Sequence, residues 1–186
     1  MYKDKTLKKY LDDLAAKLPA PGGGSAVAMN AAMGISLISM VINFTIGKPK
    51  YAKYDLELRQ MLKKAESLRE KFLDLVDLDV LAFKSKNLRD SLNIPFMLAR
   101  LVFEAIKLCP ELIKKGNINL VSDVAVAAVM LEAAFVSASF NVEINLKSLG
   151  DKKLTSTIRK ELNQKGKKVW HIRLITEDKV GKIIRG

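Results

Sequence analysis

Among the residues that could do chemistry, Asp79 stands in the most unusual surroundings. If its segment is helical, its neighbours three and four positions away on both sides, and the one seven positions before it, are all apolar, Phe72 and Phe83 among them. Asp79 would then face the core, whereas Asp77 and Asp74 would lie on the solvated side. A carboxylate on an apolar face is costly unless it is paired or its pKa is raised. These conditions suit a general acid or base near neutral pH, with a structural carboxylate paired to a lysine as the alternative.

Three further polar residues occupy a mostly apolar segment later in the chain. Asp123 has largely apolar helical neighbours, although Ser122 and Asp123 would equally suit an ordinary N-cap. Asn141 and Asn145 are one helical turn apart, so their amides can read a heterocycle edge or join two buried helices. On a continuous helix Asp123 and Asn141 share a face about 27 Å apart. They therefore serve opposite ends of a long ligand or sites shared across a dimer, or one of them is structural.

A glycine loop supplies the third candidate feature. Gly22, Gly23 and Gly24 let the backbone approach a ligand without a Cβ clash, and they lead into a helix at Ser25. Free N–H groups and the helix dipole favour an anion or a polar ring edge there. A tight turn followed by an N-cap is the alternative. Because no P-loop lysine follows the glycines, the loop is not expected to hold a nucleotide.

The single histidine and the single cysteine exclude several catalytic classes. With only His171, zinc sites and relays that need several histidines are ruled out, and we expect His171 on the surface and no metal site. Cys109 lies in an apolar stretch and is predicted to be a packed thiol. One cysteine cannot form an internal disulfide, which favours a reducing cytoplasm.

The net charge of +12 predicts a surface that attracts polyanions, without choosing among them. Aromatic residues are few and do not alternate with the basic ones, so we expect no nucleic-acid partner. Residues 1–17 lack the apolar stretch of a signal peptide. Residues 18–47 carry no charge and are long enough to span a bilayer, but they open with prolines and glycines and contain several polar residues. We therefore expect a central bundle helix rather than a membrane span.

Apolar periodicity and helix breakers predict an all-α protein, with residues 1–186 forming a single domain. Residues 87–93 are expected to be a break, and residues 166–186 form a tail in which 169–175 fit a strand or a helix equally well. Two helices are nearly all apolar, which is many for one small bundle. We therefore expect an antiparallel multi-helix bundle that associates through its apolar helices as a homodimer or higher homo-oligomer. The expected helices are 6–18, 25–46, 54–86, 95–115 with a kink at Pro110, 122–148 and 152–165.

Several motifs in this order resemble the cyclodeaminase/cyclohydrolase family. That family contains the cyclodeaminase domain of formiminotransferase-cyclodeaminase and bacterial methenyltetrahydrofolate cyclohydrolases. Order and most spacings agree from about residue 7 to 162, although the segment between Phe83 and Pro95 is shorter than is usual for the family. The motifs that carry the resemblance are residues 19–25, 43–45, 47–51, 79–83, 116–117, 122–123 and 141–146.

The resemblance implies an all-helical oligomer that acts on tetrahydrofolate derivatives, with no tightly bound cofactor. A cyclodeaminase closes 5-formiminotetrahydrofolate to 5,10-methenyltetrahydrofolate and expels ammonia, whereas a cyclohydrolase adds water to the methenyl bridge. Asp79 would be the general acid/base, and Lys48 and Lys50 would meet the glutamate tail of the folate. The short segment 84–94 motivates an alternative, a non-catalytic binding or scaffold homologue. The residues implied to bind the substrate are Gly22, Gly23, Gly24, Ser25, Lys48, Lys50, Asn117, Ser122, Asp123, Asn141 and Asn145.

Overall fold

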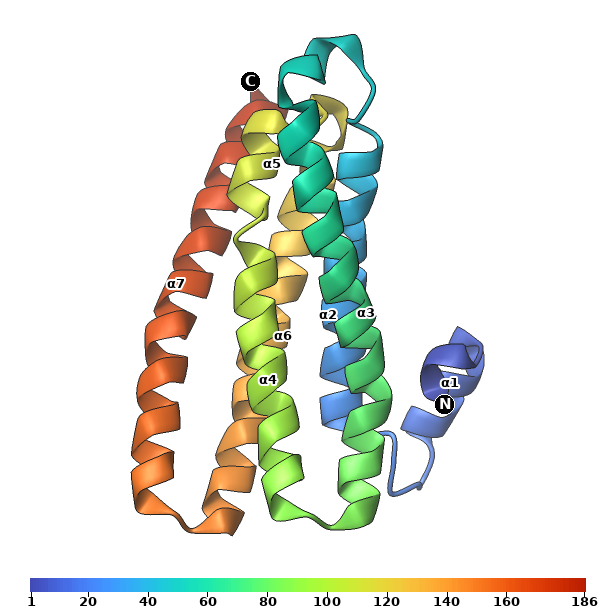
Figure 1. The fold of residues 1–186 in the computed structure, drawn as a ribbon, viewed down its shortest axis with the longest axis vertical. Helices are drawn as coiled ribbons and strands as arrows, with labels where there is room; N and C mark the ends of the chain where they lie inside the picture. The colour runs from blue at the N-terminus through green and yellow to red at the C-terminus, as the bar shows by residue number, and fades with distance from the viewer.

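The computed structural model describes residues 1–186, and helices make up the fold without any strand (Figure 1), which confirms the all-α class. Short 3-10 helices η1, η2 and η3 cover Tyr2–Asp4, Pro49–Tyr54 and Ile118–Leu120. The α-helices are α1 (Leu7–Ala15), α2 (Gly23–Asn43), α3 (Asp55–Ser85), α4 (Leu88–Ile106), α5 (Cys109–Lys115), α6 (Val121–Leu149) and α7 (Lys152–Arg185).

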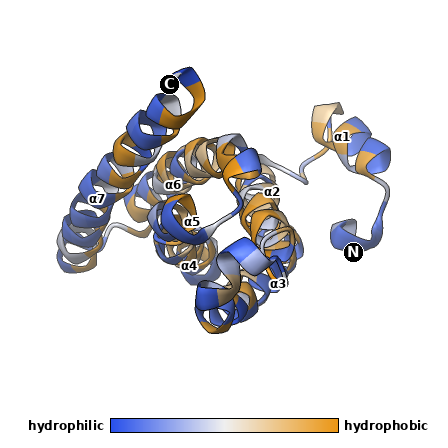
Figure 2. Ribbon diagram, turned by 90° about the horizontal axis from the view of Figure 1, so that it is seen from above, coloured by the Kyte–Doolittle hydropathy of each residue, from blue (hydrophilic) through white to orange (hydrophobic).

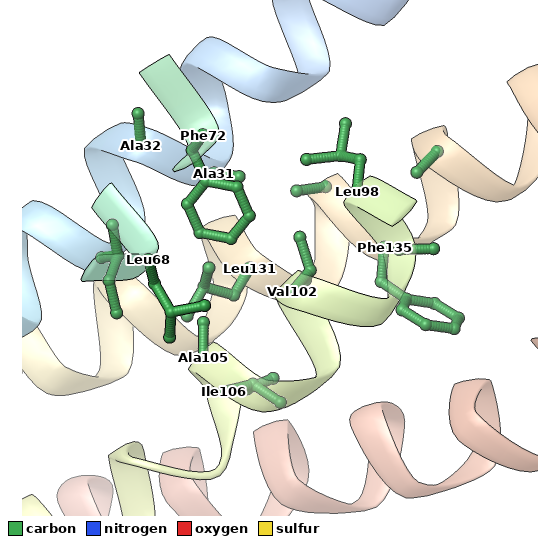
Figure 3. Close-up of a cluster of buried hydrophobic side chains, with 14 of the residues drawn as sticks. Ala31, Ala32, Leu68, Phe72, Leu98, Val102, Ala105, Ile106, Leu131 and Phe135 are labelled. Carbon is green, nitrogen blue, oxygen red and sulfur yellow. The ribbon is translucent and has the colours of Figure 1, made fainter. Parts of the chain in front are cut away.

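The long helices α2, α3, α4 and α6 run up and down in an antiparallel bundle, and α7 packs along the outer side of α6 (Figures 1 and 2). Their apolar stripes meet in one core, where Phe72, Leu98 and Leu131 are almost fully buried (Figure 3). Small residues such as Ala31 bring α2 close to its neighbours. This packing fixes which helix ends lie together.

The expected break at residues 87–93 is wrong. Asn87 instead caps α4, because its side chain accepts hydrogen bonds from the backbone N–H groups of Arg89 and Asp90. The turn between α3 and α4 is therefore short, and Lys86 adopts a positive φ of 55° within it. Pro95 consequently lies inside α4 rather than in its first turn.

Two further expectations about the C-terminal half need correction. Pro110 does more than kink the helix: α4 ends at Ile106 and α5 starts at Cys109, because proline cannot donate a hydrogen bond to the preceding turn. The tail of residues 166–186 is helical and continues α7 to Arg185, so the strand alternative is wrong. Gly166 lies inside this helix, where an added Cβ would come within 3.3 Å of the Phe135 ring.

Helix α1 is capped by Thr6 and ends at Ala15, short of the expected residue 18, and most of it does not pack on the bundle. Thr6 accepts a hydrogen bond from the N–H of Lys9. Yet Leu7 and Leu11 of the apolar stripe are exposed, and the helix stands apart from the bundle (Figures 1 and 2). Only Tyr10 on this helix is buried.

Helix α2 and the segment 118–149 are long and apolar enough to cross a membrane by length and composition. In the most apolar window of each, 61% and 39% of the residues are buried within the bundle. The second segment thus leaves much of its apolar surface uncovered by this chain.

Candidate functional site

A cavity of about 250 Å³ opens at one end of the bundle, where α2 and α4 begin and α3 and α6 end. The helix ends that form it lie at the foot of the bundle in Figure 1. Asp79 is the only charged residue in its lining. The structure therefore brings together most of one half of the predicted site, namely Gly22, Gly23, Gly24, Asp79, Asn141 and Asn145.

Asp79 is partly buried and accepts a hydrogen bond at Oδ2 from the backbone N–H of Ser25, at 2.9 Å. Burial raises the pKa of this carboxyl, and the Ser25 hydrogen bond offsets the rise in part. No lysine or arginine forms an ion pair with Asp79, so the structural alternative of a lysine pair does not hold. A carboxyl whose pKa is raised beside a ligand-sized space is suited to taking up and returning protons.

The glycine loop is pressed against this carboxylate. A Cβ on Gly24 would lie 2.0 Å from Oδ1 of Asp79, so no larger residue fits without moving the acid. A Cβ on Gly22 would meet nothing within 4 Å. Helix α2 begins at Gly23 with Gly22 as its N-cap residue, so Ser25 is the third helical residue and not the first. In that position its N–H is free to bind Asp79.

Asn145 joins α6 to α4 at a defect that Pro95 creates. Proline lacks an N–H, so the carbonyl of Ser91, four residues earlier, has no partner within α4. The side-chain amide of Asn145 donates to that carbonyl at 2.8 Å, and to the carbonyl of Asn141 at 2.8 Å. Asn145 thus has a structural role as well as a place in the cavity lining. The side-chain amide of Asn141 has no hydrogen-bond partner within the protein and is available to a ligand.

Two features of the cavity escaped the sequence analysis. Phe83, expected in the core stripe of α3, is 57% exposed and lines the cavity. Ser91, from the segment expected to be a break, and Pro95, expected in the first turn of the next helix, also line it. The cap signal of Asn87 and the four-residue spacing of Ser91 and Pro95 were the available clues.

Asp77 is not on the solvated side, which corrects the expectation for it. Its side chain is 5% exposed, because the N-terminal segment covers it. Oδ1 accepts the backbone N–H of Tyr2 at 2.5 Å, and Oδ2 accepts that of Lys3 at 3.3 Å. Helical phase alone could not reveal this contact across more than seventy residues of sequence.

The other half of the predicted site lies at the opposite end of the bundle. Lys48 and Lys50 follow the C-terminal end of α2, about 30 Å from the glycine loop at 1.5 Å per residue. Asn117 lies beside them and is structural, since its N–H donates to Oγ1 of Thr45 and its side chain to the carbonyl of Phe44. One chain therefore does not bring this group to the Asp79 cavity.

Ser122 and Asp123 also belong to this distal end. They fall in the first turn of α6, whose N-cap residue is Leu120, so the N-cap expectation for them is wrong. Neither side chain forms a hydrogen bond within the chain, and Asp123 is partly buried.

His171 and Cys109 lie where the sequence predicts them. His171 is exposed on α7, away from the cavity. Cys109 is fully buried, and burial raises the pKa of its thiol to about 12, which keeps it protonated and unreactive. No three His, Cys, Asp or Glu side chains are grouped so as to hold a metal ion.

Comparison with known proteins places this geometry in context. The family model described as formiminotransferase-cyclodeaminase matches residues 6–88 and 84–164. Methenyltetrahydrofolate cyclohydrolase from Methylorubrum extorquens is 36% identical, over 86% of this chain and 88% of its own length. Formimidoyltransferase-cyclodeaminase from Rattus norvegicus is 31% identical over 80% of this chain but only 32% of its own length. The crystal structure of formiminotetrahydrofolate cyclodeaminase from Thermotoga maritima superposes with a TM-score of 0.94 at 27% identity, covering 99% of this chain and 100% of that one.

Proposed function

This chain belongs to the formiminotransferase-cyclodeaminase family, and from that premise we propose that it is a methenyltetrahydrofolate cyclohydrolase with Asp79 as its acid/base. The observation that carries the proposal is the Asp79 carboxyl, which has a raised pKa, lines the cavity and is bound by the Ser25 N–H. The full-length similarity to the Methylorubrum cyclohydrolase favours this reaction.

In the proposed reaction, water adds to the carbon that bridges two folate nitrogens. Asp79 as the carboxylate accepts a proton from the attacking water, which gives a tetrahedral carbon. The same group, now protonated, returns that proton to the departing N5 as the carbon–nitrogen bond breaks. The hydroxyl proton of the tetrahedral carbon is released to solvent as the C=O bond forms, and the formyl group stays on N10. One partly buried carboxyl with a raised pKa can perform both transfers. The free amide of Asn141 and the ring of Phe83 would contact the pterin.

Cyclodeaminase activity is a second candidate, favoured by the similarity to the Thermotoga cyclodeaminase over the whole chain. Here N10 would attack the formimino carbon and lose its proton, which Asp79 would pass to the formimino nitrogen. A second proton, taken up from solvent, would let that nitrogen leave as ammonia as its bond to the carbon breaks, which gives the methenyl bridge. Both reactions pass through a tetrahedral carbon between the same two nitrogens, so the same cavity serves either.

The test is the absorbance decay of 5,10-methenyltetrahydrofolate in a buffer that hydrolyses it slowly. We expect the wild type to accelerate the decay and Asp79→Asn to lose about 10²- to 10⁴-fold of kcat. Asp74→Asn is the matched control, because Asp74 is an exposed acid on the same helix, paired only with Lys3. If the wild type is inert here but active on the formimino substrate, it is a cyclodeaminase. Inertness toward both would favour the scaffold alternative.

A homodimer would reunite the two halves of the site. The outward side of α6 carries a stripe of exposed apolar residues at spacings of three and four, with small Ala133 at its middle. Such a stripe without a charge is typical of an interface. Its members are Val126, Val129, Ala133, Val136, Phe140 and Ile144.

An antiparallel pairing about Ala133 has a direct consequence for the cavity. Asp123 and Glu143 both lie ten residues from Ala133. A two-fold axis there would set Asp123 of the partner subunit beside Asn141 and Asn145. The partner's Lys48 and the partner's Lys50 would then lie toward the open side of the cavity, where a folate's glutamate tail would leave it.

We also propose a cytoplasmic location. The support is the free, buried Cys109, which needs no oxidising compartment.

A further inference from the structure

Tyr10 is the one buried residue of a helix that otherwise stands off the bundle. The Tyr10 side chain is 2% exposed, although Leu7 and Leu11 of α1 are open to solvent. Its hydroxyl lies 3.1 Å from Oγ of Ser25, which is itself fully buried. Burial, above all, keeps the pKa of this phenol raised, so it remains a neutral hydrogen-bonding group at physiological pH.

Ser25 connects Tyr10 to the catalytic acid. Its hydroxyl meets Tyr10 while its backbone N–H donates to Asp79 at 2.9 Å. This N–H donates the only hydrogen bond that the Asp79 carboxylate accepts within the protein. Whatever fixes the first turn of α2 therefore fixes the acid.

The segment that carries Tyr10 is anchored to the same stretch of α3. The backbone N–H groups of Tyr2 and Lys3 both bind the buried Asp77, two residues before Asp79. The Tyr2 ring packs edge-on against the Tyr10 ring, with centroids 5.6 Å apart and an interplanar angle of 82°. Tyr10 is thus held from the Asp77 side of α3 while its hydroxyl reaches the loop on the Asp79 side.

We propose that Tyr10 is a positioning residue for the reaction: through Ser25 it fixes the N–H group that orients the Asp79 carboxylate. This inference rests on the proposed function, and it adds α1 to the site although α1 does not line the cavity. No charged group faces Asp79 from α2, α4 or α6, whose contributions to the cavity are the glycine loop, Ser91, Pro95, Asn141 and Asn145. The local polar contacts of Asp79 therefore depend on Ser25.

The test compares Tyr10→Phe with Tyr2→Phe. Both remove one hydroxyl from the same edge-to-face pair of tyrosines, but the Tyr2 hydroxyl donates to Asp13 and not to Ser25. We expect Tyr10→Phe to lower kcat about 10-fold with little change in KM, because the acid is misplaced while the cavity stays intact. The acid limb of the kcat/KM profile should move to higher pH, since a loosened Ser25 N–H no longer stabilises the carboxylate. Tyr2→Phe should change neither.

A titration separates this proposal from the proposed function. The Asp79 carboxyl carbon, labelled with ¹³C and assigned from its absence in Asp79→Asn, reports the protonation midpoint without any substrate. Tyr10→Phe and Ser25→Ala should each raise that midpoint, and the double variant should raise it no further. Ser25→Ala also serves if Tyr10→Phe does not fold. An unchanged midpoint in the folded variants would overturn the role of Tyr10, even if the wild type is an active cyclohydrolase. If the wild type is inert but the variants still raise the midpoint, the role of Tyr10 stands and the proposed reaction is wrong.

Discussion

The two ends of the bundle contrast in how their polar residues are used. At the cavity end, Asp79 has one hydrogen bond and Asn141 has a free amide, so both retain capacity for a ligand. At the distal end, Asn117 donates hydrogen bonds to Thr45 and to Phe44, and it holds the chain in place. Motifs that look equivalent in the sequence therefore do different work. The contrast teaches that unsatisfied bonding capacity beside a cavity, rather than polarity alone, marks the reactive end.

The strongest test of this difference between the two ends is to add a side chain in the glycine loop. Gly24→Ala places a methyl group on the Asp79 carboxylate, where the ideal Cβ would be 2.0 Å from Oδ1. We expect cyclohydrolase activity to fall at least about 100-fold, because a displacement of the order of 1 Å is enough for such a loss. The measurement is the decay rate of methenyltetrahydrofolate, and circular dichroism checks that the variant is folded.

Gly22→Ala is the control for that loss. It adds the same methyl group two residues earlier, where nothing lies within 4 Å and the φ of −131° suits alanine. It should keep activity within about 2-fold of the wild type. Equal losses in both variants would show that the loop needs flexibility rather than contact with Asp79.

The distal end can be tested by mixing two inactive variants. One carries Asp79→Asn, and the other carries Lys48→Ala, Lys50→Ala and Asp123→Asn. If the partner subunit completes each cavity, a heterodimer has one site with both halves intact. Refolding an equal mixture should then restore about a quarter of wild-type activity, because half of the dimers are mixed and each has one good site.

The same experiment can also contradict the shared site. If the distal variant is fully active by itself, the distal residues are structural and the cavity end is sufficient. If both variants are inactive but mixing restores nothing, the distal group acts within its own chain. Val129→Asp, which puts a charge in the α6 stripe, should convert the dimer to monomer in sedimentation and abolish the restored activity.

The sequence was informative where one helix decides the outcome. The apolar neighbours of Asp79 predicted its partial burial, and the breakers predicted the helical class and most of the long helices. The prediction that Asp77 is solvated was wrong, because its burial comes from a segment far away in sequence. The continuation of α7 beyond residue 166 was not predicted either. Its polar composition gives a weak periodicity, and its stability comes from packing on α6.

The site was only half predictable for the same reason. The local motifs identified the glycine loop and Asn141, but not which helix ends share a cavity. Ser91 and Pro95 were missed because the sequence pattern predicts a helix start at Pro95, whereas its effect inside α4 is to free the Ser91 carbonyl for Asn145. Tyr10 was missed because its contact with Ser25 depends on how α1 folds back after the Pro19–Pro21 turn.

A double-mutant cycle measures how the cavity end is held together. Asn145→Ala should lower the free energy of unfolding by about 1–3 kcal/mol, because the Ser91 carbonyl loses its donor. In a Pro95→Ala background, the new N–H of residue 95 can donate to that carbonyl. The Asn145→Ala loss should then shrink by about 1 kcal/mol in urea unfolding. An equal loss in both backgrounds would mean that Asn145 stabilises the fold through some other contact.

The smallest expected effect is the pH dependence that Asp79 confers on stability. Its pKa is raised in the folded state by burial, so the folded protein binds a proton that the unfolded chain releases near pH 3.9. Stability from this group is therefore present below that pH and declines as the pH rises toward the raised folded value. Asp79→Asn removes the penalty, so it should match the wild type near pH 3.5 and become the more stable of the two by pH 7. The measurement is the urea midpoint of both proteins across this pH range.

Asp77→Asn offers the opposite case, because it weakens acceptors for two backbone N–H groups and should destabilise the fold at pH 7. If Asp79→Asn behaved in the same way, the carboxylate would be a structural group, and the cavity end would differ from the distal end only in shape.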